Sequence, residues 1–297
     1  MSRPVFRFAP SPNGLLHLGH AYSALVNLRL ARAAGGTMLL RIEDIDTARC
    51  TPENEAMMLE DLEWLGFEWD ASPRRQSDHF ADYRAALEDL LAESLVYPST
   101  MSRGEIRRAV EREVENGGSW PSDPDGVPLY PGNECELGPQ ARNEIMAGVA
   151  DYTLRLDNAA TLARLKAPLQ WYEEGSGPDG QTGWIDVNLA KWGDVVLARK
   201  DTPASYHLAC VIDDGIEGVT HVVRGRDLFH STSVHRPLQQ LFGLPAPAYF
   251  HHDLILDETG RKLSKSVGST ALRHLRAAGL TPVDVRRMIG LEDQPAH

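Results

Sequence analysis

An alternation of strand and helix over the first 66 residues is the feature that most constrains the fold. Residues 5–9 predict a strand, and apolar residues at helical spacing follow from His17 to Gly35. Residues 37–42 are typical of a buried strand, and residues 51–65 predict a second helix that ends at a glycine. Because strands that alternate with helices form parallel sheets, the chain is predicted to have an α/β fold.

The middle of the chain breaks this alternation. Residues 99–189 are rich in glycine and proline and carry short candidate strands at 152–156 and 184–187. We interpret this stretch as an α+β insertion that splits the parallel sheet. Alternation is expected to resume with a strand at 193–197, and the end of the chain is predicted to be helical from Ser269. The predicted units are a catalytic first half (1–98), an insertion (99–189), a catalytic second half (190–245) and a loop with a helical C-terminal segment (246–297).

Composition and charge narrow the functional class. Hydrophobic residues make up 42% and charged residues 24% of the 297 residues, which is ordinary for a globular protein. The chain shows no apolar run long enough for a membrane helix and no secretory leader, and its three cysteines lie far apart. We therefore expect a cytoplasmic protein with no membrane partner. The net charge of −12 argues against non-specific nucleic-acid binding, so no DNA partner is expected.

A first candidate motif lies between the first strand and the first helix, where the sequence reads PSPNGLLHLGH at residues 10–20. A helix N-terminus at the carboxyl edge of a parallel sheet is suited to bind phosphate. His17 and His20 lie on one face of that helix and could donate hydrogen bonds to phosphate oxygens, while Gly19 would leave room for a nucleotide. The alternative interpretation is a surface turn with two solvated histidines.

A second candidate motif is the run RKLSKS at residues 261–266, which follows a turn with a glycine. Three cations and two hydroxyl groups on one loop have the chemistry of a phosphate clamp. A solvated basic loop is the alternative, and it is the commoner role of such a run.

Taken together and in this order, the two motifs resemble the HIGH and KMSKS signatures of the class I aminoacyl-tRNA synthetases, here HLGH at 17–20 and KLSKS at 262–266. Flanking segments are similar to those of the glutamyl-tRNA synthetases: RFAPSPNG at 7–14, LRIEDID at 40–46, YHLACVIDD at 206–214 and HVVRGRD at 221–227. Asn13 and Cys210 depart from the pattern, in which threonine and asparagine are usual. The resemblance implies a Rossmann-like parallel sheet.

The resemblance also implies roles for individual residues. It assigns catalysis to His17, His20, Lys262 and Lys265, ATP binding to Pro10, His17, Gly19, His20 and Lys265, and glutamate binding to Arg7, Ala9, Ser11, Glu43, Tyr206 and Arg224. The chemistry agrees, because a glutamate carboxylate is bound well by a guanidinium fork and the substrate ammonium group by a carboxylate. Each residue also has an ordinary alternative, such as a surface arginine or a core tyrosine.

Length separates the branches of this family. Complete glutamyl-tRNA synthetases carry a large anticodon-binding domain after the KMSKS loop, whereas here the chain ends 31 residues beyond Ser266. The architecture therefore resembles the glutamyl-Q tRNA(Asp) synthetases. That resemblance implies activation of L-glutamate by ATP with Mg²⁺, without tRNA present. Glutamate would then pass to the cyclopentenediol of queuosine at the wobble position of tRNA(Asp). We expect a monomer.

Some members of this branch hold zinc in the insertion through a motif that begins Tyr-x-Cys-x-Cys. Here Ser99 and Met101 occupy the cysteine positions and Cys135 is a lone thiol, so no zinc is predicted. Candidate tRNA contacts are two sets of arginines, one in the insertion and one near the C-terminus: Arg103, Arg107, Arg108 and Arg112, and Arg273, Arg276, Arg286 and Arg287.

Three other functions are compatible with the motifs. The chain could be a compact discriminating glutamyl-tRNA synthetase that charges tRNA(Glu). It could be a small-molecule nucleotidyltransferase with the same HxGH signature, or a non-catalytic paralogue that binds tRNA or an adenylate. The retained His17, His20, Lys262 and Lys265 argue against lost catalysis.

Overall fold

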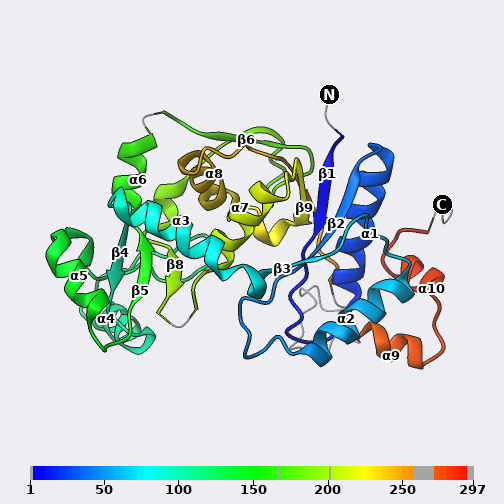
Figure 1. Ribbon diagram of the computed structural model, residues 1–297, viewed down its shortest axis with the longest axis horizontal. Coiled ribbons are helices and arrows are strands. Elements are labelled where there is room, and N and C mark those ends of the chain that lie inside the picture. The colour runs from blue at the N-terminus through cyan, green and yellow to red at the C-terminus, as the bar shows by residue number, and fades with distance from the viewer. Residues whose placement is uncertain (1–2, 166, 201, 257–270, 293–297) are drawn as a thin grey trace.

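The protein is described from a computed structural model that covers residues 3–165, 167–200, 202–256 and 271–292. It has an α/β fold built around a mostly parallel seven-stranded sheet in the order β3-β2-β1-β9-β10-β6-β7 (Figure 1). Only β7 runs antiparallel to its neighbour in this sheet. The strands are β1 (Val5–Phe8), β2 (Thr37–Ile42), β3 (Arg74–Arg75), β6 (Gln170–Glu173), β7 (Gly183–Asp186), β9 (His221–Gly225) and β10 (Ala248–His252).

The strand order creates a switch point at the centre of the sheet. The chain leaves β1 toward β2 on one side, and it leaves β9 toward β10 on the other side, so the connections from these two adjacent strands diverge. In open α/β sheets, ligands bind in the crevice that such a divergence leaves at the carboxyl ends of the strands. The fold therefore favours a site beyond the ends of β1 and β9.

Local signals explain the first helices, which form as the sequence predicts. Helix α1 (Leu18–Ala33) begins directly after His17, which caps it. Helix α2 (Pro52–Leu65) begins after Thr51, whose hydroxyl accepts a hydrogen bond from the Asn54 amide at 3.3 Å. It ends at Gly66, which adopts a left-handed conformation with φ of 77°.

A second, antiparallel sheet lies in the other half of the molecule, in the order β4-β5-β8 (Figure 1). Its strands are β4 (Val96–Ser99), β5 (Thr153–Leu156) and β8 (Val196–Arg199). The expectation that the parallel sheet resumes near residue 195 is wrong, because β8 pairs with β5. The parallel sheet is instead extended by β6 and β7, from inside the predicted insertion. Trp171 on β6 is buried in a core shared with Val222 and Tyr249, which explains this pairing.

The remaining helices cover the two sheets. They are α3 (Phe80–Ala92), α4 (Arg103–Glu115), α5 (Pro139–Ala147), α6 (Asn158–Leu165), α7 (Tyr206–Ile216), α8 (Thr232–Leu241), α9 (Leu272–Ala277) and α10 (Pro282–Met288). Both short C-terminal helices lie in the half of the molecule that contains α1 and α2 (Figure 1). Arg273 and Arg276 of α9 each donate a hydrogen bond to Glu60 of α2 at 2.9 Å, so these two tail arginines hold the end of the chain in place. None of the helices in the described parts of the chain is long and apolar enough to span a bilayer.

Candidate active site

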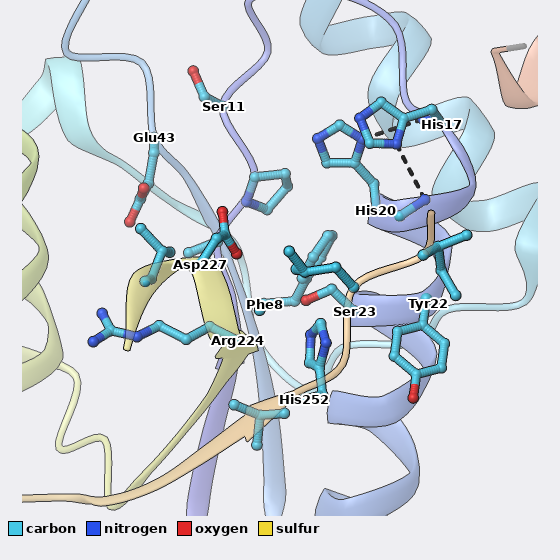
Figure 2. Close-up of a pocket in the computed structure, with 18 of the residues that line it drawn as sticks. Phe8, Ser11, His17, His20, Tyr22, Ser23, Glu43, Arg224, Asp227 and His252 are labelled. Atoms are coloured by element: carbon cyan, nitrogen blue, oxygen red, sulfur yellow. Dashed lines mark hydrogen bonds between the residues drawn. The ribbon is translucent and has the colours of Figure 1, made fainter. Parts of the chain in front are cut away.

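A pocket of about 480 Å³ opens beyond the carboxyl ends of β1 and β9, at the switch point of the sheet (Figure 2). It brings together every predicted site residue that the structure describes. These are Arg7, Ala9, Pro10, Ser11, His17, Gly19, His20, Glu43, Tyr206 and Arg224. In Figure 2, His17 and His20 lie on one side of the pocket, and Glu43 and Arg224 lie on the other. The pocket thus has a histidine end and an arginine end, while the individual roles stay predictions.

Lys262 and Lys265 of the second motif lie outside the described residues. The chain enters that segment from the pocket, because Asp253 and Ile255 line it. It emerges at Ala271, which forms an antiparallel bridge with His17, and the Leu272 amide donates to the Leu16 carbonyl at 2.8 Å. Both described flanks of the second motif are therefore anchored next to the first motif.

The histidine end is organised by the N-terminus of α1. Nδ1 of His17 accepts a hydrogen bond from the Gly19 amide at 3.1 Å, and Nδ1 of His20 accepts one from the His17 amide at 3.2 Å. A neutral imidazole that accepts at Nδ1 carries its proton on Nε2. The caps therefore give both neutral rings the same tautomer, with the proton on Nε2. A Cβ atom on Gly19 would lie 3.0 Å from the His17 ring, so the glycine makes room for that histidine.

The arginine end contains a buried ionic cluster. Nε of Arg7 donates to Oδ1 of Asp214 at 3.0 Å, and Nη1 of Arg41 donates to the same oxygen at 2.8 Å. Arg41 also pairs with Glu43 at 3.3 Å and with Glu217 at 2.8 Å. Burial alone would raise the pKa of Asp214, but the two guanidinium groups lower it. Asp214 is therefore ionised and fixes the orientation of Arg7.

Glu43 faces the pocket from the end of β2. Burial raises its pKa, although Arg41 and Arg7 act in the opposite direction. Cys210, the residue that departs from the family pattern, lies beneath it with Sγ 3.7 Å from Nη2 of Arg7. Burial and the nearby Asp214 raise the pKa of Cys210 to about 12, so it remains a thiol at neutral pH.

Arg224 is buried in a different way from Arg7 and Arg41. Its hydrogen bonds go to neutral groups: Nε2 of His251 at 3.0 Å, the Tyr206 hydroxyl at 3.2 Å, Nδ1 of His235 at 3.2 Å and the Thr232 hydroxyl at 2.7 Å. Among the residues that the structure describes, no carboxylate forms an ion pair with it. A buried cation without a carboxylate partner is suited to bind the carboxylate of a ligand.

The donors that remain define how a carboxylate could be bound. Arg224 uses four of its five N–H groups in these bonds, which leaves one on Nη2. The Tyr206 hydroxyl accepts from Arg224 and so can donate its own proton, and burial raises the pKa of Tyr206, which keeps it protonated. Arg7 uses Nε and Nη2, so most of its outer edge remains for a ligand. The full guanidinium fork expected from the sequence is therefore available on Arg7 and not on Arg224.

A second cavity of about 620 Å³ adjoins the arginine end. The two cavities share four lining residues, Ser11, Asn13, Glu43 and Tyr206. The second cavity extends from there to Asp46 and Arg49, and to residues between β8 and α7. A ligand in it would approach the arginine end of the first pocket from outside.

The residues at the position where some members of the branch hold zinc do not fit the metal. The Ser99 hydroxyl bonds to Oγ1 of Thr153 at 2.6 Å and accepts from Nε of Arg155 at 2.9 Å, so a guanidinium lies beside it. Arg155 stacks over the ring of Tyr130 at 4.0 Å, and the Tyr130 hydroxyl donates to Glu134. The Arg155 cation and the hydrogen-bonded Glu134 carboxylate thus occupy the space beside Ser99. Within the described ranges, no group of three or more potential metal ligands is present.

The comparisons with known proteins agree with this geometry. The family described as class I tRNA synthetases (E and Q), catalytic domain, matches residues 5–292. The chain belongs to this family. Glutamyl-Q tRNA(Asp) synthetase of Rhodobacter capsulatus is 46% identical over 97% of this chain and all of its own length. The enzyme of that name from Symbiobacterium thermophilum is 37% identical over 97% of this chain and 87% of its own length.

Solved structures give the same result. The glutamate-tRNA synthetase of Elizabethkingia anophelis superposes with a TM-score of 0.79 at 27% identity and covers 99% of this chain. This chain spans 63% of that synthetase. As a member of the class I family, the chain is a synthetase-type ligase for which ATP is a substrate. The family match includes the antiparallel sheet and both C-terminal helices as well as the central sheet.

The interpretation from sequence missed several residues of the site. Arg41, Glu173, His235 and His251 surround the predicted arginines, but the sequence assigns no role to any of them, although Arg41 lies within the segment at 40–46 that resembles the family. Arg41 could have been identified from the sequence, because it is a charged residue inside the mostly apolar strand β2. The sequence offers a weaker indication for Glu173, which ends a strand with aromatic residues two positions before a glycine.

Proposed function

We propose that this protein activates glutamate with ATP and transfers it to queuosine at the wobble position of tRNA(Asp). The observation that carries the proposal is the pocket itself, which places a helix N-terminus with two capping histidines opposite two buried arginines. The names of the Rhodobacter and Symbiobacterium relatives, with which the chain shares nearly its whole length, support the choice of acceptor.

In the first step, an oxygen of the glutamate α-carboxylate attacks the α-phosphorus of ATP. A new carboxyl–phosphate bond forms while the bond to pyrophosphate breaks, and no proton is transferred. The work of the protein is therefore positioning and charge stabilisation. We assign phosphate contacts to Nε2 of His17 and of His20 and to the N-terminus of α1, with Pro10 and Gly19 beside the nucleotide. Lys262 and Lys265 are assigned to the leaving pyrophosphate on the basis of their motif. Mg²⁺ would arrive with ATP.

We assign the glutamate side chain to the arginine end. The outer edge of Arg7, the remaining N–H of Arg224 and the Tyr206 hydroxyl offer donors to one carboxylate. Glu43 would hold the substrate ammonium group, with Ala9 and Ser11 lining the space between. A neutral glutamine side chain would gain much less from two buried guanidinium groups, so the site should select glutamate over glutamine.

In the second step, a hydroxyl of the cyclopentenediol attacks the carbonyl carbon of glutamyl-adenylate. The ester bond forms while the bond between the carbonyl carbon and the phosphate oxygen breaks, AMP leaves, and the proton of the hydroxyl passes to the departing phosphate or to solvent. We assign the approach of the acceptor to the second cavity, because it opens onto the amino-acid end through Ser11, Asn13, Glu43 and Tyr206. Its position away from the histidine end would let the acceptor enter while the nucleotide remains bound.

We also propose that the tRNA lies along α4. That helix has no buried residue, and its four arginines form no ion pair among the described residues, whereas Arg273 and Arg276 are held by Glu60. We place the protein in the cytoplasm as a monomer that binds neither membranes nor DNA. The three cysteines are unpaired thiols, which is consistent with a reducing compartment.

The decisive experiment measures glutamate-dependent ATP–pyrophosphate exchange without tRNA, followed by transfer of labelled glutamate to tRNA(Asp) with and without queuosine. We expect exchange, and transfer only to the queuosine-bearing tRNA. The Lys265→Ala variant should lose most exchange, and unchanged exchange would remove that lysine from the mechanism. Transfer to tRNA(Glu) instead would identify a compact discriminating synthetase. No exchange with any amino acid would favour a non-catalytic binding function.

A further inference from the structure

Three adjacent parallel strands carry a row of polar side chains toward the arginine end of the pocket. Arg224 on β9 and His251 on β10 are directly paired in the strand register. Glu173 is the last residue of β6, the next strand in the sheet, and belongs to the stretch that the sequence predicts as an insertion. All three are nearly inaccessible to solvent, at 5%, 1% and 1% exposure. The row therefore runs from the pocket across the sheet to β6, the strand next to the edge.

The hydrogen bonds in this row determine the protonation state of the central ring. Nε of Arg224 donates to Nε2 of His251, and an arginine can only donate, so Nε2 carries no proton. The proton of a neutral ring is then on Nδ1, which donates to Oε2 of Glu173 at 2.6 Å. A second proton on the ring would have to displace Arg224 and place two cations in contact. His251 is therefore neutral between a cation and an anion.

Glu173 is held in place by the backbone around it. Its Oε1 accepts from the His251 amide at 2.9 Å and from the Gly175 amide at 3.0 Å. A Cβ atom at Gly175 would lie 2.5 Å from the His251 carbonyl oxygen, so this close approach of the two chain segments requires glycine. With three N–H donors the carboxylate is satisfied without any direct arginine or lysine partner among the described residues.

We propose that Glu173 and His251 are positioning residues that hold Arg224 ready for the substrate carboxylate; this rests on the proposed function. Glu173 balances the buried charge of Arg224 through a neutral ring, without occupying the guanidinium itself. Arg7 is balanced differently, because Asp214 contacts it directly. This relay of Glu173, His251 and Arg224 leaves the last N–H of Arg224 for a ligand, and it fixes the plane of the guanidinium through Nε.

Isosteric substitutions test the relay. In Glu173→Gln, either orientation of the new amide places a donor against a donor, at Nδ1 of His251 or at the two backbone amides. His251→Leu removes the hydrogen bonds of the ring and places an apolar side chain at the same buried position. His251→Gln should restore function, because its amide can donate to Glu173 and accept from Arg224 without titrating. Tyr249→Phe is the matched control on the same strand, since it removes only the buried hydrogen bond that Gln239 donates to the Tyr249 hydroxyl and keeps the ring that packs against His251 and Arg224.

The assay is ATP–pyrophosphate exchange by the full chain, with KM for glutamate and for ATP determined separately. We expect Glu173→Gln and His251→Leu to raise the glutamate KM about 10- to 100-fold, the loss typical of one charge-assisted hydrogen bond. The ATP KM should change less than about threefold. His251→Gln should recover to within about fivefold of the wild type, and Tyr249→Phe should match the wild type. Because KM does not depend on the fraction of chains that fold, reduced folding of a variant does not obscure the result.

Glutamate binding measured by calorimetry separates this inference from the proposed function. If the wild type binds glutamate but shows no exchange, the proposed reaction fails, and weaker binding in His251→Leu still supports the relay. If the wild type is active and both disruptive variants keep its glutamate KM, the relay is wrong. An equal rise in the KM of glutamate and of ATP would also overturn it, because that pattern indicates general damage to the fold.

Discussion

Acid should destabilise this protein through its buried histidines, and His251 allows the effect to be calculated. Burial lowers the pKa of His251 to about 4, although the hydrogen bond to Glu173 acts in the opposite direction. The charge of Arg224 lowers the pKa further, and its Nε donates to Nε2 of His251 and must be displaced before a proton can bind there. In the unfolded chain the same ring titrates near 6.5.

The direction of the pH effect on stability follows from the protons that the folded and the unfolded chain bind. Between pH 6.5 and 4 the unfolded chain binds a proton at residue 251 and the folded chain does not, so stability falls as the pH falls through that window. Linkage gives a loss of about 2 kcal/mol at pH 5 and about 3 kcal/mol at pH 4 from this one group. Against a total stability of about 5–15 kcal/mol for a domain, the loss is large enough to measure.

Other groups titrate in the same range, so the test compares two proteins. Burial also lowers the pKa of His235, while it raises the pKa of Glu43 and of Glu217, and these carboxyls act in the opposite direction. Denaturant unfolding at pH 7.5 and at pH 5 should be measured for the wild type and for His251→Gln, which cannot titrate. The wild type should lose about 2 kcal/mol more than the variant between the two pH values. Equal losses would show that His251 accepts a proton in the folded state and would refute the neutral relay.

Three further predictions concern other parts of the chain. Chelation should leave the melting temperature unchanged, because Arg155 and the hydrogen-bonded Glu134 occupy the position at which zinc would bind; equimolar zinc that survives dialysis would contradict this expectation. Charge reversal of Arg107 and Arg108 on α4 should reduce the slope of log affinity for tRNA against log salt concentration by about one for each phosphate that is no longer neutralised. A slope that falls only on charge reversal of Arg276 would place the tRNA on the C-terminal helices instead. Asp214→Asn should lower the free energy of unfolding by about 3–5 kcal/mol, because two buried guanidinium groups lose their shared carboxylate. A loss below about 1 kcal/mol would show that solvent reaches the cluster.

Features with local causes were predictable from the sequence. Helix α2 has its limits within one residue of the expected ones, because Thr51 and Gly66 act as caps through their own conformation. The strand–turn–helix around His17 was predictable for the same reason. The pairing of the strands was not predictable from the sequence. Strands β8 and β6 are short, and only the tertiary core decides which sheet each of them joins. The motif residues could be placed in one site only through the resemblance to a family.

The three buried arginines show what a sequence leaves open and a structure decides. Each lies in a strand of mostly apolar residues, and that pattern does not separate them, although the family resemblance implies a substrate role for Arg7 and Arg224 alone. Arg41 has four carboxylates within 4 Å, so its charge is fully engaged by the fold. Arg7 contacts one carboxylate, and Arg224 contacts none among the described residues. Because attraction for a further anion falls as the protein itself neutralises a cation, Arg224 and Arg7 should bind substrate while Arg41 stabilises the fold. Arginine-to-lysine substitutions should therefore separate the three, with the glutamate KM rising at positions 7 and 224 and the free energy of unfolding falling most at position 41.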